Sequence, residues 1–396
     1  MKSEFEYQTV LLPHEEQSKR IERMRSLMAA AKISAILVSD NANIYYLTGR
    51  VFSGYVYLPV DGMPIYFIHR PVELKGDGTV YIHKPELIPE SLGLNIPENL
   101  GLEMDALSYS QTQRLMKVFG DGTRYANASP LLRTARSVKT DYELNLIQQS
   151  GVKQMGVYAR IPRLYQDGMT DLELQIEIER CSRLEGCLGQ FRISGDSMEL
   201  FMGNVLTGDN ADTPCPYDFA MGGGGVDPSL PVGADESVIS DGHSVMVDVN
   251  GNYTGYMTDM TRTYYLEHLS NEARDAHQCS IDICRALERM GTPGTPAKLL
   301  YEEAERMVRE RHLENYFMGH RQHASFIGHG VGIEINELPV IAPRSRDILQ
   351  EGNVLALEPK FVIPKVGAVG IENTYTVTPE GLKCLTPFQE QLIELI

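Results

Sequence analysis

Apolar residues recur at helical spacing in some segments of the chain and alternate with polar residues in others. In the first third, the spacing over residues 14–32 predicts an amphipathic helix, and residues 108–119 also favour a helix. Residues 34–39 form a short apolar run typical of a buried strand, and residues 55–68 resemble a hairpin. Together these elements predict a smaller α/β domain over residues 1–137.

The remaining residues, 138–396, contain the same order of predicted elements twice. Helices are predicted over residues 140–165, 170–184, 270–290 and 295–311, strands over residues 188–193, 331–335, 354–362 and 369–377, a long loop over residues 203–233, and a hairpin over residues 245–265. Capping boxes of the form Thr-x-x-Glu open the first two helices. Two helices followed by strands, repeated once, predict a duplicated unit.

Charge and composition narrow the class of protein. The net charge of −17 over 396 residues argues against a nucleic-acid surface and against binding to an acidic membrane. The six cysteines form no C-x-x-C pair, which is typical of reduced thiols, and neither a signal peptide nor a membrane-spanning apolar run is visible. We therefore expect a cytoplasmic protein that binds neither nucleic acid nor membrane.

The segment VMVDVNGNYTGYMTDMTRTYY, residues 245–265, carries two carboxylates in surroundings that favour β-structure. Alternating valines around Asp248 predict one strand, and Asp259 lies near the start of a second. A hairpin turning near residues 253–254 would place Asp248 directly opposite Asp259, with Cβ atoms about 5 Å apart. A turn at residues 250–251 would not pair the two aspartates. Two carboxylates held this close need a cation or a shared proton.

Three more residues of ligand type interrupt apolar stretches: His329 in GHGVG, Glu358 in VLALEP and Glu372 in VGIENT. Each alone is ordinary, as a loop histidine or a solvated strand end. With Asp248 and Asp259 they give four carboxylates and one imidazole on strands of two similar halves. Four carboxylates brought together repel one another unless cations neutralise them. We therefore expect two divalent metal ions, which could be Mn²⁺, Co²⁺, Fe²⁺ or Zn²⁺.

The motifs around these residues resemble those of the pita-bread metallopeptidases, which include prolidase, Xaa-Pro aminopeptidase, methionine aminopeptidase and creatinase. The matching stretches are D-x10-D-x-T-R-T with Asp248 and Asp259, GHGVG with His329, LEP with Glu358, and IENT with Glu372. YYLTG at residues 45–49 resembles the N-terminal domain of the creatinase and prolidase branch. The resemblance implies an α+β pita-bread fold with pseudo-twofold duplicated halves over residues 138–396, preceded by the smaller α/β domain.

The resemblance also implies a dinuclear metal-dependent hydrolase that acts on a small peptide or amide. The activity it implies first is that of a proline-specific dipeptidase or aminopeptidase that uses a metal-bridging hydroxide. Glu358 would then be both a metal ligand and the catalytic acid or base, with Asp248 and Glu372 as candidate bridging ligands. A homodimer is implied as well.

Three positions depart from the family pattern. Asn336 stands seven residues after His329, where the peptidases usually carry a histidine, and Cys215 takes the place of another histidine. Gly370 replaces the arginine of R-I-E-D. Because these accessory groups bind substrate in the family, Cys215 and Asn336 are the expected substrate-binding positions. The changes leave open a different C–N hydrolase or lyase reaction on the same scaffold, or a non-catalytic binding module.

Overall fold

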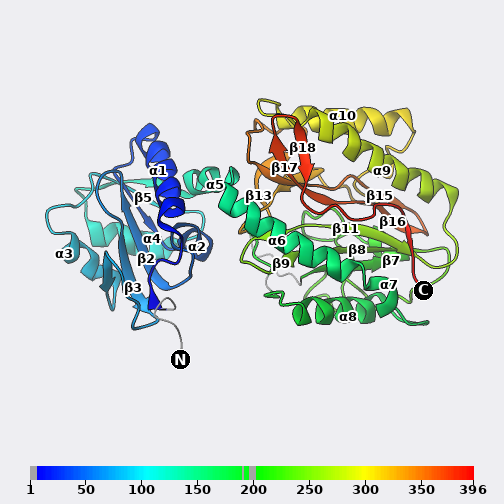
Figure 1. The fold of residues 1–396 in the computed structure, drawn as a ribbon, viewed down its shortest axis with the longest axis horizontal. Helices are drawn as coiled ribbons and strands as arrows, with labels where there is room; N and C mark the ends of the chain where they lie inside the picture. The colour runs from blue at the N-terminus through cyan, green and yellow to red at the C-terminus, as the bar shows by residue number, and fades with distance from the viewer. Residues whose placement is uncertain (1–6, 190, 196–201) are drawn as a thin grey trace. The chain divides into compact units, whose positions relative to one another are not determined.

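The computed structural model describes residues 7–189, 191–195 and 202–396. The chain forms two compact units, Met1–Arg136 and Ser137–Ile396, each built on sheets of its own (Figure 1). No helix within the described ranges is both long enough and apolar enough to cross a membrane.

The first unit contains one mixed six-stranded sheet in the order β4-β3-β2-β1-β5-β6. Its strands are β1 (Ala35–Val38), β2 (Ser53–Pro59), β3 (Ile65–Arg70), β4 (Thr79–Tyr81), β5 (Asn99–Leu102) and β6 (Arg124–Asn127), and its helices are α1 (His14–Ala30), α2 (Asn41–Thr48), α3 (Ile88–Leu92), α4 (Tyr109–Phe119) and α5 (Ser129–Ser137). Strands β2 and β3 form the predicted hairpin, and α1 and α4 are the predicted helices. The unit is α/β, as the pattern indicates.

The second unit twice repeats an order of helices followed by strands. Its helices are α6 (Asp141–Tyr158), α7 (Ile161–Leu164), α8 (Asp171–Leu184), α9 (Asn271–Met290) and α10 (Ala297–Glu310). The strands of the first half are β7 (Gly203–Thr207), β8 (Ser244–Val249), β9 (Gly251–Asn252), β10 (Met257–Thr258) and β11 (Thr261–Tyr265). Those of the second half are β12 (Gly328–Gly330), β13 (Glu337–Ile341), β14 (Val354–Leu357), β15 (Lys360–Ile363), β16 (Gly367–Gly370), β17 (Asn373–Thr378), β18 (Gly381–Cys384) and β19 (Ile393–Glu394).

Two larger sheets result, in the orders β19-β11-β8-β7 and β13-β12-β14-β17-β18, and β15 pairs with β16 as a separate hairpin. Both predicted capping boxes are present. The side chains of Thr140 and Thr170 accept hydrogen bonds from the backbone N–H groups of Glu143 and Glu173, the third residues of α6 and α8. In return, the glutamate side chains accept hydrogen bonds from the backbone N–H groups of the two threonines.

Several predicted strand bounds in the second unit are wrong. The expected loop over residues 203–233 begins with β7. Residues 331–335 are not a strand, because they turn around Glu337, whose Oε1 accepts hydrogen bonds from the N–H groups of Ile333 and Glu334. Within residues 188–193, the described residues form no strand, and residue 190 lies outside the described residues.

The two long strands predicted over residues 354–362 and 369–377 are each broken in two. The first is interrupted at residues 358–359, between β14 and β15, and the second at residues 371–372, between β16 and β17. Each break coincides with one of the predicted glutamate ligands. Continuous ladder pairing would direct these side chains to alternate sheet faces, whereas the breaks free them to point elsewhere.

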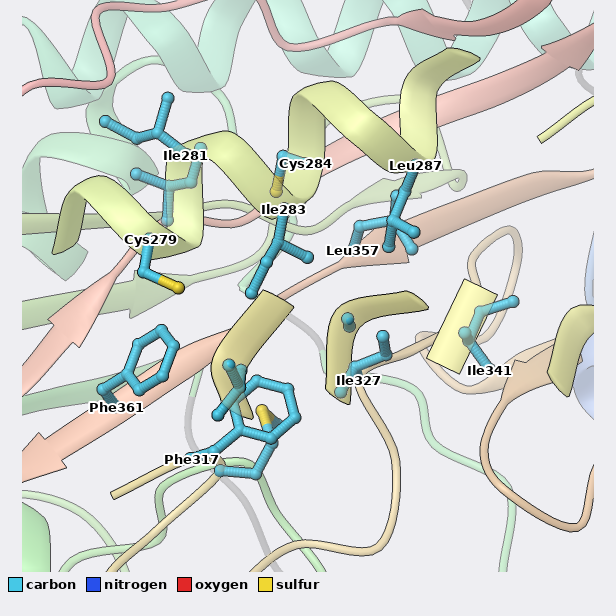
Figure 2. Packing of buried hydrophobic residues seen from close by; sticks show 14 of the residues in the cluster. Cys279, Ile281, Ile283, Cys284, Leu287, Phe317, Ile327, Ile341, Leu357 and Phe361 are labelled. Carbon is cyan, nitrogen blue, oxygen red and sulfur yellow. The ribbon is translucent and has the colours of Figure 1, made fainter. Parts of the chain in front are cut away.

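Helix α9 covers the core of the second half (Figure 2). Ile283 and Leu287 on α9 belong to the same buried cluster as Leu357 of β14 and Phe361 of β15. The rings of Phe317 and Phe361 pack with centroids 5.3 Å apart. Because burying one such side chain stabilises the fold by about 1.5–3 kcal/mol, this cluster fixes β14 and β15 firmly beneath α9.

Candidate metal centre

The hairpin of β8 and β11 carries the first two ligand-type residues, in a register different from the predicted one. Strand β8 pairs antiparallel with β11 so that Asp248 lies opposite Thr261, and β9 pairs with β10 in the same register. The turn therefore spans residues 253–256 and contains Gly255, whose φ of +88° favours glycine. The predicted pairing of Asp248 with Asp259 is wrong, because Gly255 moves the turn one residue towards the C-terminus.

All five predicted ligand residues nevertheless converge, because each stands at or near a strand end. Their positions are Asp248 in β8, Asp259 between β10 and β11, His329 in β12, Glu358 directly after β14, and Glu372 directly before β17. They form two groups of three ligand atoms, each group lying within 4.8 Å: Asp259, His329 and Glu372 make the first, and Asp248, Glu358 and Glu372 the second. Glu372 belongs to both groups.

His329 presents one ring nitrogen to this cluster. Its Nδ1 lies 3.2 Å from the carbonyl oxygen of Gly330, and the tautomer that donates this hydrogen bond leaves Nε2 with a free lone pair. Nε2 lies 3.4 Å from Oε1 of Glu358 and 3.7 Å from Oδ2 of Asp259. Metal-binding histidines show this arrangement, with one nitrogen held by the backbone and the other facing the ion.

Glu372 is held firmly but keeps one oxygen without a partner. Its Oε2 accepts a hydrogen bond from Oγ1 of Thr261 at 2.7 Å, and the two residues also pair through their backbones. Its Oε1 is buried and has no hydrogen-bond partner among the described residues. Because an unpartnered buried carboxylate oxygen is costly, its position favours a cation on the side of Asp259 and His329.

One residue of the cluster, Lys360, has no counterpart among the predicted ligands. Its side chain is fully buried, and Nζ lies 2.7 Å from Oδ2 of Asp248, 2.8 Å from Oε2 of Glu358 and 3.0 Å from Oε2 of Glu372. These carboxylates are the second of the two ligand groups. The signal in the sequence was a lysine within the apolar stretch VLALEPKFVI, because a buried lysine requires acidic partners.

The pKa values of the cluster differ between its two sides. Burial, and then the charge of Asp248, raise the pKa of Asp259 to about 7, and burial with the neighbouring carboxylates raises the pKa of Glu372 well above its ordinary value. Burial would also raise the pKa of Glu358, but Lys360 and His329 outweigh it and hold that pKa at about 2. Lys360 and His329 thus outweigh the effect of burial on the pKa of Glu358, whereas burial and the neighbouring carboxylates prevail at Asp259 and Glu372.

Cys215 and Asn336, expected at substrate-binding positions, have partners elsewhere. Oδ1 of Asn336 accepts a hydrogen bond from the backbone N–H of Ser194 at 2.8 Å, and Nδ2 donates to the Ser194 carbonyl at 2.5 Å. The Cys215 thiol lies 3.4 Å from the carbonyl oxygen of Pro231, and the amide of Gln322 bonds to both backbone groups of Cys215. Burial raises the pKa of the Cys215 thiol, which lowers its reactivity.

Gly370 lies opposite Lys360 in the β15–β16 hairpin. Its φ is +138°, and a Cβ atom there would lie 2.9 Å from the carbonyl oxygen of Pro359 and 3.1 Å from Cα of Lys360. Both the conformation and the space therefore require glycine. The position that carries arginine in the family pattern faces the buried lysine here.

Comparison with known proteins agrees with this geometry. Residues 145–379 match metallopeptidase family M24, and residues 20–138 match the creatinase/prolidase N-terminal domain. The chain is 26% identical to the Xaa-Pro dipeptidase of Pyrococcus furiosus over 381 residues, and 24% identical to that of Pyrococcus horikoshii over 382 residues; each alignment covers 95% of this chain and 99% of the relative.

Among solved structures, an Xaa-Pro dipeptidase from Bacillus anthracis is similar with a TM-score of 0.81 at 24% identity, covering 96% of this chain and 100% of that one. The other reactions that the sequence left open, and the non-catalytic module, gain no support from these relatives. Because the family match covers more than half of the chain, the protein belongs to metallopeptidase family M24, with the pita-bread fold and a creatinase/prolidase N-terminal domain.

Proposed function

We propose that this protein is a metal-dependent dipeptidase that hydrolyses Xaa-Pro bonds, with Xaa-Pro aminopeptidase activity as the nearest variant. The observation that carries the proposal is the buried cluster of four carboxylates and one imidazole in a member of this family. The Xaa-Pro dipeptidases that align along almost the whole chain support the choice of substrate.

Membership of the family implies divalent metal ions, and part of the cluster fits one well. Asp259, His329 and Glu372 present ligand atoms close together, with Nε2 of His329 and Oε1 of Glu372 both free to bind. Two carboxylates and one imidazole suit Mn²⁺, which we propose as the ion, ahead of Co²⁺, Fe²⁺ and Zn²⁺. The second ligand group does not fit an ion while it holds the Lys360 ammonium.

A divalent ion supplies Lewis acidity and a nucleophile that is available at neutral pH. The side chains of the cluster would do the rest. Glu358 stays ionised at neutral pH, and we propose that its Oε1, which faces His329, accepts a proton from the attacking water and passes it to the departing proline nitrogen. Thr261 orients Glu372 through a hydrogen bond of 2.7 Å.

Asn336 and Cys215, two of the three positions that differ from the family pattern, receive different proposed roles. We propose that Asn336 positions the segment 191–195 through its paired hydrogen bonds to Ser194, so that its effect on substrate is indirect. Cys215 lies in a small cavity lined by loop residues that include Gln322 and His323. A pocket-lining role for this thiol remains our proposal, since the thiol lies 3.4 Å from the backbone carbonyl oxygen of Pro231.

Turnover of dipeptides tests the function directly. Purified protein with added Mn²⁺ should hydrolyse Xaa-Pro dipeptides such as Ala-Pro and Leu-Pro, and should leave the matching Xaa-Ala dipeptides largely intact. Glu358→Gln should reduce kcat by at least about 100-fold, because it removes the proton acceptor. The control is Glu179→Gln, a half-buried carboxylate on α8 that accepts a hydrogen bond from Gln175. No turnover of any Xaa-Pro dipeptide by the wild type would refute the proposal.

We further propose that the protein is a cytoplasmic homodimer and that the boundary between its two functional domains follows residue 137. The free thiols of all six cysteines support a reducing compartment, and the net charge of −17 gives no reason to expect nucleic acid or acidic membrane as a partner. Light scattering on the eluted protein tests the dimer, and limited proteolysis between α5 and α6 tests the boundary.

A further inference from the structure

The ammonium group of Lys360 occupies the space between three ligand carboxylates. Nζ lies within 3.0 Å of one oxygen each of Asp248, Glu358 and Glu372. All three N–H groups of the ammonium therefore have an acceptor. A divalent ion binds carboxylate oxygens at about 2.0–2.6 Å, so it cannot share this position with the ammonium.

The strand leaves the Lys360 side chain no other direction. Along β15, Phe361 packs into the core beneath α9 (Figure 2), and Ile363 belongs to the same buried cluster. Val362 packs on the opposite face with residues of β7, β8 and β16. Because side chains alternate between faces, Lys360 points the same way as Val362. Its backbone is fixed by pairing with Gly370, so a one-residue slip would expel Phe361 from the core.

The two glutamates divide their oxygen atoms between two sides of the cluster. Oε2 of both Glu358 and Glu372 faces Lys360. Oε1 of Glu358 lies 3.4 Å from Nε2 of His329, and Oε1 of Glu372 is unpartnered among the described residues. Asp259 lies on this same side, 3.7 Å from Nε2. The side that faces Lys360 therefore already contains a cation, the ammonium group. The side that faces His329 presents ligand atoms without a cation.

We propose that this centre binds one divalent ion per chain and that the ammonium of Lys360 replaces the second. The single ion would be held by Asp259, His329 and Glu372. Asp248 then anchors the ammonium instead of a metal. The inference rests on the proposed function only in that a divalent ion is required.

The facing strand supports the same conclusion. The resemblance implies an arginine where this chain has Gly370, so a positive charge is absent there and present on the paired residue, Lys360. A side chain at position 370 would crowd Pro359 and Lys360, since a Cβ atom alone comes within 2.9 Å of the Pro359 carbonyl oxygen. The glycine lets β15 approach closely enough to bring its lysine into the cluster. Gly370 and Lys360 thus act as a pair.

Metal counting on the intact wild-type chain is the first test. The protein is freed of metal by chelation, dialysed to equilibrium against excess Mn²⁺, and analysed by elemental mass spectrometry against protein concentration. We expect one Mn²⁺ per chain. Electron paramagnetic resonance should show isolated Mn²⁺, and anomalous scattering from crystals should show one peak, beside Asp259 and His329.

Removing the lysine should create the second site. Lys360→Ala deletes both the charge and the bulk of the side chain, and should raise the Mn²⁺ content to two per chain with an exchange-coupled resonance signal. The control is Lys365→Ala, which removes an exposed lysine from the turn of the same hairpin and leaves the carboxylates alone. That variant should still bind one ion.

Each outcome decides the proposal. Two ions in the wild type, none in the wild type, or a single ion among Asp248, Glu358 and Glu372 would overturn it, as would one ion in Lys360→Ala. If Lys360→Ala fails to fold, the wild-type count and the anomalous peak decide alone. Dipeptide turnover is scored separately: a wild type with one ion and no Xaa-Pro activity would refute the proposed function and leave this inference intact.

Discussion

Replacing Arg262 with lysine should destabilise the second unit strongly, although the hydrogen bonds of Arg262 go to backbone carbonyls and an amide side chain and not to a ligand carboxylate. Its guanidinium is fully buried and donates five hydrogen bonds of 2.6–3.1 Å. The acceptors are the carbonyl oxygens of Thr261, Glu372, Phe388 and Gln389 and the side chain of Asn373. Arg262 thus connects β11 to the backbone of the ligand residue Glu372 and to the C-terminal segment.

The size of the effect follows from the number of donors lost. A lysine ammonium has three donors at a single point, so at least two of these five hydrogen bonds are lost. Hydrogen bonds from a charged donor are worth about 1.5–3 kcal/mol each, which gives about 3–6 kcal/mol for Arg262→Lys. Domains are typically stable by only about 5–15 kcal/mol, and at about 2–4 °C per kcal/mol the loss should lower the melting temperature by about 6–24 °C.

Urea unfolding and thermal melting followed by circular dichroism measure this change, since the chain has no tryptophan to report by fluorescence. The matched control is Arg306→Lys on α10, whose guanidinium is half exposed and pairs with Glu303 and Glu310. Exposed pairs of this kind contribute about 0.2–1 kcal/mol, so the control should melt close to the wild type. A loss below about 1 kcal/mol for Arg262→Lys would refute the reasoning.

Three further predictions test other parts of the site and its support. Burial lowers the pKa of His277 from 6.5 to about 4, so the unfolded chain binds more protons between these values; stability is complete above about pH 6.5 and falls by up to about 3 kcal/mol towards pH 4. The free-energy advantage of the wild type over His277→Gln in urea should therefore shrink on acidification, and a pH-independent difference would contradict this. Thr261→Val removes the hydrogen bond to Glu372 and should weaken Mn²⁺ binding about 10–100-fold in chelator competition, whereas unchanged affinity would argue against a positioning role. Asn336→Ala should speed amide hydrogen exchange at Ser194 with α9 unaffected, and equal protection would show that the paired hydrogen bonds do not hold that segment.

Much of the architecture could be predicted because its signals are local. The capping boxes at Thr140 and Thr170 mark helix starts through bonds between residues three apart, and these bonds are present. The register of the ligand hairpin could not be predicted in the same way. It depends on which turn position adopts a positive φ, and that position is Gly255, directly after the predicted turn at residues 253–254.

The candidate site shows the same division between local and tertiary information. The five ligand residues can be recognised in the sequence, because a carboxylate or imidazole inside an apolar strand needs a compensating partner. The partners of Asn336 and Cys215 do not, because Ser194 and Gln322 lie more than a hundred residues away in sequence. A residue at a position where the family binds substrate can therefore bond to another part of its own chain instead.

The rule that identified the ligands also applies to Lys360, because a buried ammonium needs compensating partners just as a buried carboxylate does. Four carboxylates in one buried cluster establish that cations are needed, but they do not establish which cations. An ammonium on a neighbouring strand neutralises one negative charge and satisfies three oxygen atoms, at the place where a second ion would otherwise bind. Counting ligand residues therefore counts the negative charge to be balanced and not the number of metal ions. The residue two positions after Glu358 decides how much of that balance the chain provides for itself.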